Sequence, residues 1–167
     1  MALDEGAEIS FEPIVATGAN SARPHHIPEK RKLGNFVLVD FGVRLDGYCS
    51  DFTRCYFRGE CRKEREAYEK CRQVLEGMRK GLSGCRTGAD VTRLAEKLMK
   101  ENGLPKLAHA IGHGIGLEVH EYPRLNANSK DAVEGAALAI EPAAYFAAFG
   151  VRYEMMVAGV LGKWREI

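Results

Sequence analysis

Two neighbouring apolar segments of this chain each carry an aspartate where a buried strand usually has an aliphatic side chain. Asp40 lies in F-V-L-V-D-F-G-V and Asp51 in Y-C-S-D-F-T-R-C-Y-F. Their β-branched and aromatic residues predict two strands, and Asp46-Gly47 between them is a typical two-residue hairpin turn. With that turn, Asp51 pairs with Gly42, which shares a sheet face with Asp40 because side chains alternate along a strand. The two carboxylates, about 7–8 Å apart at the backbone, then converge on one point that a cation can occupy.

The C-terminal part of the chain repeats this arrangement with two glutamates. Glu141 and Glu154 each interrupt an apolar run, on either side of a turn expected at 147–150. His113 lies between two glycines, which let the backbone approach its neighbours closely. Burying four uncompensated carboxylates would cost more free energy than the net stability of a domain. Oxygen ligands with one imidazole favour Mn²⁺, Fe²⁺, Co²⁺ or Zn²⁺ over a thiolate zinc site, so the five side chains predict a metal site.

Each of these residues alone also has a purely structural explanation. Asp40 fits a sheet edge or a solvated face, His113 fits a hydrogen-bonded loop, and Glu141 before a proline fits the end of a strand. The metal site is favoured because two hairpins each carry two acids on one face.

The order of the expected elements predicts an α+β domain. Apolar residues at helical spacing predict a helix over 62–80, and Thr87 with Asp90 resembles a capping box that opens a second helix, which Asn102-Gly103 closes. Strands are expected at 13–16, 36–43 and 48–57 before the helices, and at 112–119, 136–146 and 151–160 after them, with a polar loop between 120 and 131. This order indicates an antiparallel sheet with helices on one face, in a single domain spanning residues 1–167.

The composition excludes several classes of protein. With 24 Lys and Arg against 23 Asp and Glu, the net charge of +1 gives no basic field for a nucleic-acid backbone. The longest apolar stretch, 135–151, is interrupted by Glu141-Pro142, so we expect no membrane span. The five cysteines form no C-x-x-C pair and no signal segment precedes them, which indicates the packed thiols of a cytoplasmic protein rather than a disulfide framework.

Six short motifs follow one another along the chain: I-V-A-T-G-A-N-S-A-R-P-H at 14–25, V-D-F-G at 39–42, G-Y-C-S-D-F-T-R at 47–54, G-H-G-I-G-L-E-V-H-E at 112–121, I-E-P at 140–142 and V-R-Y-E at 151–154. In this order and spacing they resemble the pita-bread metallopeptidase family M24, especially its Xaa-Pro aminopeptidase and prolidase branch. The resemblance covers residues 11–160. It implies a curved antiparallel pita-bread sheet with helices on one face, and hydrolysis of the bond before proline in dipeptides or at peptide N-termini.

The resemblance also implies two adjacent divalent ions, manganese first, with cobalt, zinc or iron as alternatives. Asp40 would hold one ion, His113 and Glu141 would hold the other, and Asp51 and Glu154 would bridge both. Two such ions activate a water molecule for attack on a carbonyl. Glu141 is expected to carry a proton to the leaving amine.

The remaining roles that the resemblance implies concern the substrate and the surroundings of the ions. His25 and His120 would contact the substrate and the developing oxyanion. Arg124, in H-E-Y-P-R, matches a prolidase position that binds the carboxylate of a dipeptide, with a solvated loop arginine as the alternative. Thr53 is expected to support a bridging aspartate, and His109 either borders the pocket or caps the preceding helix.

The chain also departs from the family pattern. Members usually have two helices before the segment that opens this chain, and many have a separate N-terminal domain, so we expect a homo-oligomer or a fragment of a longer parent. Ala143 replaces a usual glycine, and Met155-Met156 stand where acids usually follow Glu154. The loss of those acids is expected to weaken metal binding. The alternative function is therefore a non-catalytic pita-bread module that binds peptides or proteins. The motif context disfavours a methionine aminopeptidase, and the intact ligand set disfavours a metal-free creatinase relative.

Overall fold

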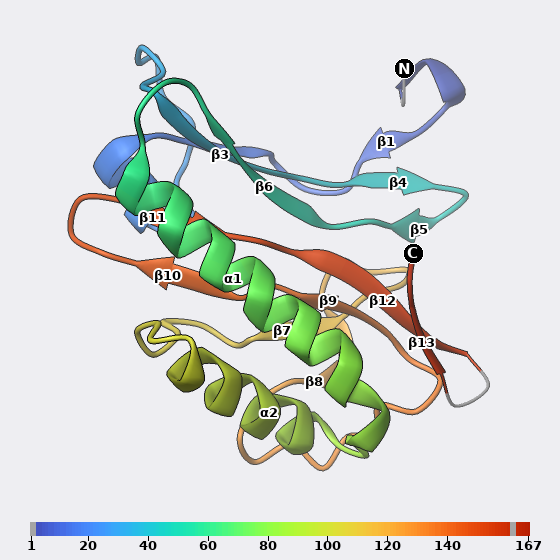
Figure 1. The fold of residues 1–167 in the computed structure, drawn as a ribbon. Coiled ribbons are helices and arrows are strands. Elements are labelled where there is room, and N and C mark those ends of the chain that lie inside the picture. The colour runs from blue at the N-terminus through green and yellow to red at the C-terminus, as the bar shows by residue number, and fades with distance from the viewer. Residues whose placement is uncertain (1–2, 161–162) are drawn as a thin grey trace.

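The computed structural model describes residues 3–160 and 163–167 (Figure 1). The helices are α1 (Arg62–Gly81) and α2 (Gly88–Glu101), with short 3-10 turns η1 (Leu3–Glu5), η2 (Gly18–Ala22) and η3 (Leu82–Gly84). The strands before the helices are β1 (Glu8–Ile9), β2 (Ile14–Ala16), β3 (Phe36–Phe41), β4 (Val43–Leu45), β5 (Tyr48–Cys49) and β6 (Phe52–Phe57). The strands after them are β7 (Gly112–Gly114), β8 (Glu121–Arg124), β9 (Ala137–Ile140), β10 (Ala143–Tyr145), β11 (Gly150–Arg152), β12 (Met155–Val160) and β13 (Lys163–Glu166).

Every strand pairing in the described part of the chain is antiparallel. The largest sheet has the order β13-β12-β9-β7-β8, and the others have the orders β2-β3-β6, β1-β4-β5 and β10-β11. The predicted α+β class, with strands on both sides of a helix pair in the sequence, is therefore confirmed.

The N-terminal hairpin has the predicted register. Asp46 and Gly47 have φ values of 51° and 86°, the left-handed backbone that a two-residue hairpin turn requires, and Leu45 pairs with Tyr48 across them. The same register continues into β3 and β6, where Asp40 pairs with Thr53. The turn therefore fixes which residues face each other along the whole hairpin.

The two helices form where the sequence predicts them and lie side by side (Figure 1). The side chain of Thr87 accepts a hydrogen bond from the backbone of Asp90, and the Asp90 carboxylate accepts one from the backbone of Thr87, so the capping box is present. The buried face of α1 consists of Ala67, Cys71, Val74, Leu75 and Met78, as its apolar spacing predicts. This face packs against β10 and β11.

Two core clusters meet at α1. One joins α1 and α2 to the C-terminal strands, with fully buried Met78 and Leu138 among its members. The other joins α1 to β3, β6 and the β10-β11 hairpin through Phe36, Leu38 and Val151. All five cysteines are free thiols and four of them are buried, as predicted. The described residues include no helix that is long and apolar enough to cross a membrane.

The chain after α2 differs from the prediction in several places. The strands expected at 136–146 and 151–160 are each broken, so Glu141 and Glu154 lie between strands and not within them. The expected strand into 118–119 is absent, because β7 ends at Gly114 and the backbone then turns, with Gly116 N donating to Glu118 O. Residues 121–124, expected within a polar loop, instead form β8 and pair with β7. β8 is mostly exposed and polar, so its pairing depends on a partner strand and not on an apolar pattern of its own.

Candidate metal centre

The N-terminal hairpin brings the two aspartates together. Continuing the observed register places Asp51 opposite Gly42, and Asp40 lies on the same face two positions away. Both side chains are buried, with 7 % exposure for Asp40 and 5 % for Asp51. The convergence predicted from the Asp46-Gly47 turn is therefore present in the fold.

The C-terminal hairpin places the two glutamates directly opposite each other. The pairs Ile140 with Met155 and Ala143 with Arg152 flank them and have the same register. The turn is tighter than expected, because Phe146 N donates to Phe149 O and Gly150 already belongs to β11. Glu154 is 2 % exposed, so this carboxylate lies inside the protein.

His113 is at the centre of β7, between β8 and β9 in the large sheet. The glycines on either side allow this close packing: a Cβ at Gly112 would lie 2.0 Å from Ala139 O, and a Cβ at Gly114 would lie 2.3 Å from Tyr122 O. Any side chain at either position would clash with a neighbouring strand. The glycines therefore keep β7 in the sheet and the imidazole beside the acids.

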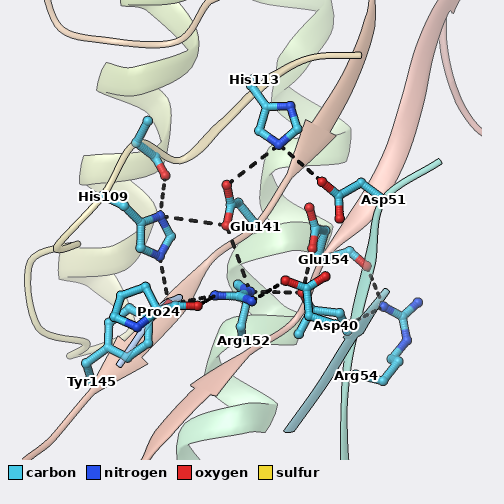
Figure 2. A network of polar contacts seen from close by, with 12 residues as sticks. Pro24, Asp40, Asp51, Arg54, His109, His113, Glu141, Tyr145, Arg152 and Glu154 are labelled. Carbon is cyan, nitrogen blue, oxygen red and sulfur yellow. Dashed lines mark hydrogen bonds and ion pairs between the residues drawn. The ribbon is translucent and has the colours of Figure 1, made fainter. Parts of the chain in front are cut away.

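The predicted ligand side chains point towards one another (Figure 2). His113 Nε2 is 3.4 Å from Asp51 Oδ2 and 4.0 Å from Glu141 Oε1. One potential ligand atom from each of Asp51, His113 and Glu154 lies within 4.8 Å of the others, a group that could hold a metal ion. The structure thus brings carboxylates from both hairpins to a single imidazole.

Arg152 is the residue of this site that the sequence analysis missed. Its guanidinium donates to Asp40 Oδ2 at 2.5 Å and to the Tyr145 hydroxyl at 3.0 Å, and its Nε is 3.9 Å from Glu141 Oε2. It is 3 % exposed, so it is a buried counter-ion among the acids. A charged residue in an apolar strand, two positions before Glu154, is the same signal that identified the acids and could have identified Arg152.

One buried arginine does not offset four carboxylates. Burial raises the pKa of Asp40 to about 6, with a further rise from Asp51, although Arg152 opposes the shift. Burial likewise raises the pKa of Glu141 to about 7. Burial and the charges of Glu141 and Asp51 raise the pKa of Glu154 well above its ordinary value. Without further positive charge, the site favours protonated carboxyl groups.

The residues fit a divalent metal. Asp40 Oδ1 is buried and has no hydrogen-bond partner among the described residues, so this oxygen lacks a positive or donor neighbour. Carboxylate oxygens with one imidazole are the ligands that Mn²⁺, Fe²⁺, Co²⁺ and Zn²⁺ accept. Burial alone would lower the pKa of His113, but its hydrogen bond with Asp51 and the charge of Glu141 raise it overall. Cations bound here would satisfy the orphaned oxygen and offset the excess negative charge.

The five predicted ligands line one cavity of about 350 Å³ together with His25 and His120. The His120 ring centroid is 4.0 Å from that of His113. Burial, followed by the nearby His113, lowers the pKa of His120. Both histidines therefore lie in the wall of the cavity that the five predicted ligands share. Arg124 lies elsewhere: it is exposed on β8 with its guanidinium 4.9 Å from the Tyr122 ring centroid, outside the lining of this cavity.

Two further residues have positions that the sequence left open or placed differently. His109 borders the site, with Nδ1 3.7 Å from Glu141 Oε2 and Nε2 2.8 Å from the Tyr145 hydroxyl. Thr53, expected to support a bridging aspartate, has its hydroxyl 2.5 Å from Glu154 Oε2 and also hydrogen-bonds to Asp40. The cause is the placement of β6 beside the start of β12, where Glu154 N donates to Thr53 O.

Comparison with known proteins agrees with this geometry. The model of metallopeptidase family M24 matches residues 1–158. The chain belongs to metallopeptidase family M24. Within the family, the chain is 37% identical over 163 residues to a Xaa-Pro dipeptidase from Lactobacillus delbrueckii subsp. lactis, with 93% of this chain and 44% of that protein covered.

Solved structures of the family confirm the expected pita-bread fold. An X-Pro aminopeptidase from Thermotoga maritima superposes with a TM-score of 0.87 at 30% identity, over 98% of this chain and 49% of that one. A prolidase from Thermococcus sibiricus superposes with a TM-score of 0.85 at 34% identity, over 95% of this chain and 45% of that one. The chain therefore spans less than half the length of these relatives, and resembles the Xaa-Pro aminopeptidase and prolidase branch along nearly all of its own length.

Proposed function

We propose that this chain carries the catalytic centre of a metal-dependent peptidase that hydrolyses the bond preceding proline. The observation that carries the proposal is the single cavity lined by Asp40, Asp51, His113, Glu141 and Glu154, which contains more negative charge than Arg152 offsets. The names of the relatives supply the substrate class, a Xaa-Pro dipeptide or a peptide with proline in second position.

The proposed site holds two divalent ions. Asp40 would bind one ion, His113 and Glu141 the other, and Asp51 and Glu154 both. Manganese is the first choice, with cobalt, zinc and iron as alternatives that suit the same donors. The close grouping of Asp51, His113 and Glu154 supports a shared position for the bridging carboxylates.

The chain's own residues would position the substrate and move the proton. Divalent ions supply a nucleophile at neutral pH and polarise the scissile carbonyl. Glu141, at the cavity wall between His109 and His113, would take the proton released on attack and deliver it to the proline nitrogen as the bond breaks. His25 and His120 would donate hydrogen bonds to the substrate and the developing oxyanion.

Arg124 and the assembly state complete the proposal. We assign Arg124 to the carboxylate of a dipeptide. Arg124 lies on a strand that pairs directly with that of His113, and its side chain must leave the Tyr122 ring to reach the substrate.

We also propose a homo-oligomer, supported by exposed apolar side chains such as Phe41 and Tyr56. A cytoplasmic location is proposed on the basis of the free thiols. Light scattering at micromolar concentration that finds only a monomer would contradict the homo-oligomer.

The test is to load the purified chain with Mn²⁺ or Co²⁺ and to assay a Xaa-Pro dipeptide and a longer Xaa-Pro peptide. We expect release of the residue before proline, and its loss in Glu141→Gln. A matched control is Glu118→Gln, because Glu118 is exposed and does not line the cavity. No turnover of either substrate with two ions bound would contradict the peptidase and favour the non-catalytic binding module.

A further inference from the structure

Thr53 occupies the junction between the two hairpins. It lies on β6 opposite Asp40, is 0 % exposed, and its backbone carbonyl accepts a hydrogen bond from Glu154 N. Its hydroxyl oxygen lies 2.9 Å from Arg152 Nε and 2.5 Å from Glu154 Oε2. The hydroxyl therefore contacts a cation and a carboxylate at the same time, from a different strand than either.

Chemistry fixes the direction of the first hydrogen bond, and the direction of the second follows where Glu154 is ionised. An arginine side chain has donors only, so the Thr53 oxygen must accept from Arg152. The Asp40 carboxylate is a second hydrogen-bond neighbour of this hydroxyl, whose single hydrogen is directed at Glu154 Oε2 in the structure. Once bound cations keep Glu154 ionised, the hydroxyl that donates to it forms a charge-assisted bond. The chain of donors runs one way, from Arg152 through Thr53 to Glu154.

Arg152 is itself held in place from several sides. It donates to Asp40 Oδ2 and to the Tyr145 hydroxyl, so its Nε cannot rotate away from Thr53 without breaking those contacts. The hydroxyl of Thr53 is thus oriented by a fixed group, and the Glu154 carboxylate that accepts its hydrogen bond is fixed in turn. One lone pair of Oε2 is used by this bond, and Glu154 is among the residues that line the cavity.

We propose that Thr53 is a positioning residue of this site: its hydroxyl, oriented by Arg152, fixes the plane of the Glu154 carboxylate so that this group can bridge two divalent ions. The inference rests on the proposed function, since it concerns the same ions. Outer residues that orient ligands in this way usually change metal affinity by about 10–100-fold when they are replaced.

The experiment compares Thr53→Val, which keeps the shape and removes the hydroxyl, with Thr53→Ser, which keeps the hydroxyl and removes the methyl group. Binding of Mn²⁺ and Co²⁺ is measured by calorimetry, and the visible absorption of bound Co²⁺ reports the coordination geometry. Thermal unfolding of the metal-free proteins separates an effect on the ligand from an effect on folding. Thr53→Ala serves as a second hydroxyl-free variant if the valine does not fold.

We expect Thr53→Val to bind both ions about 10–100-fold more weakly, with an altered Co²⁺ spectrum. Thr53→Ser should stay within about threefold of the wild type and keep its spectrum, because it retains the donor. Equal binding by wild type and Thr53→Val, or a serine variant as weak as the valine variant, would overturn the inference. A wild-type chain that binds no pair of ions would instead overturn the proposed function, before any variant is compared.

Discussion

Raising the pH is expected to destabilise the metal-free protein between about pH 5 and pH 8. The folded state holds protons on Asp40 and Glu141 to a higher pH than the unfolded chain does, because burial raises both pKa values. Between the unfolded and folded pKa values the native state binds more protons, so the free energy of unfolding falls as the pH rises. The stabilisation is fully present below about pH 4 and is lost as the pH passes through the folded values near 6 and 7.

The magnitude follows from the size of these shifts. The pKa of Glu141 moves from 4.5 to about 7, and at about 1.4 kcal/mol for each pH unit this corresponds to about 3 kcal/mol. Asp40, which moves from 3.8 to about 6, gives about 3 kcal/mol when taken alone. The two groups interact, so the values do not simply add. A loss of this size is a large part of the roughly 5–15 kcal/mol by which domains are stable.

Urea unfolding at a series of pH values, in the presence of a chelator, measures this loss. Glu141→Gln is the internal control, because it removes one acid with a raised pKa while the other titratable groups of the site remain. The pKa values of His109 and His120 are lowered and give the opposite dependence. We expect the wild type to lose about 3 kcal/mol relative to Glu141→Gln between pH 5 and pH 8. Saturating Mn²⁺ should remove the loss. A metal-free wild type whose stability does not fall relative to the variant would refute the reasoning.

Three further predictions concern the ions, the substrate and the helices. After dialysis, Asp51→Asn and Glu154→Gln should retain neither ion and Asp40→Asn should retain one, as counted by elemental analysis; equal losses in all three would contradict the proposed bridging. Arg124→Ala should raise KM for a Xaa-Pro dipeptide more than for a longer peptide, and equal effects on both substrates would count against a carboxylate contact. Thr87→Ala removes the capping box of α2 and should lower the free energy of unfolding by about 1 kcal/mol, measured with urea on the metal-free protein at one pH. No change in that value would show that the cap contributes nothing here.

The parts of the structure that the sequence predicted are those governed by local rules. The Asp46-Gly47 turn sets the register of its hairpin, so the shared face of Asp40 and Asp51 follows from the alternation of side chains. Thr87 and Asp90 each accept a hydrogen bond from the other's backbone within one helical turn, so four residues are enough to predict the start of α2. In both cases the interacting groups are close in sequence.

The parts that were not predicted depend on contacts between distant segments. β8 forms on β7 although its own residues show no apolar alternation, and the contact of Thr53 with Glu154 joins residues 101 positions apart. Arg152 was not predicted, although it gives the same signal as the acids, a charged residue in an apolar strand. The metal-ligand roles of the five cavity residues stay a prediction until ions are measured in the protein.

The junction between β6 and β12 also bears on how this site would assemble. The cavity has no complete wall until the first hairpin meets the last, and the helix pair lies between these two hairpins in the sequence. Closing so long a loop is entropically costly, so Asp40 and Asp51 come together with Glu141 and Glu154 only late in folding. Binding of a cation would therefore occur in the final stage of folding. Release of that cation would accompany the first separation of the two hairpins.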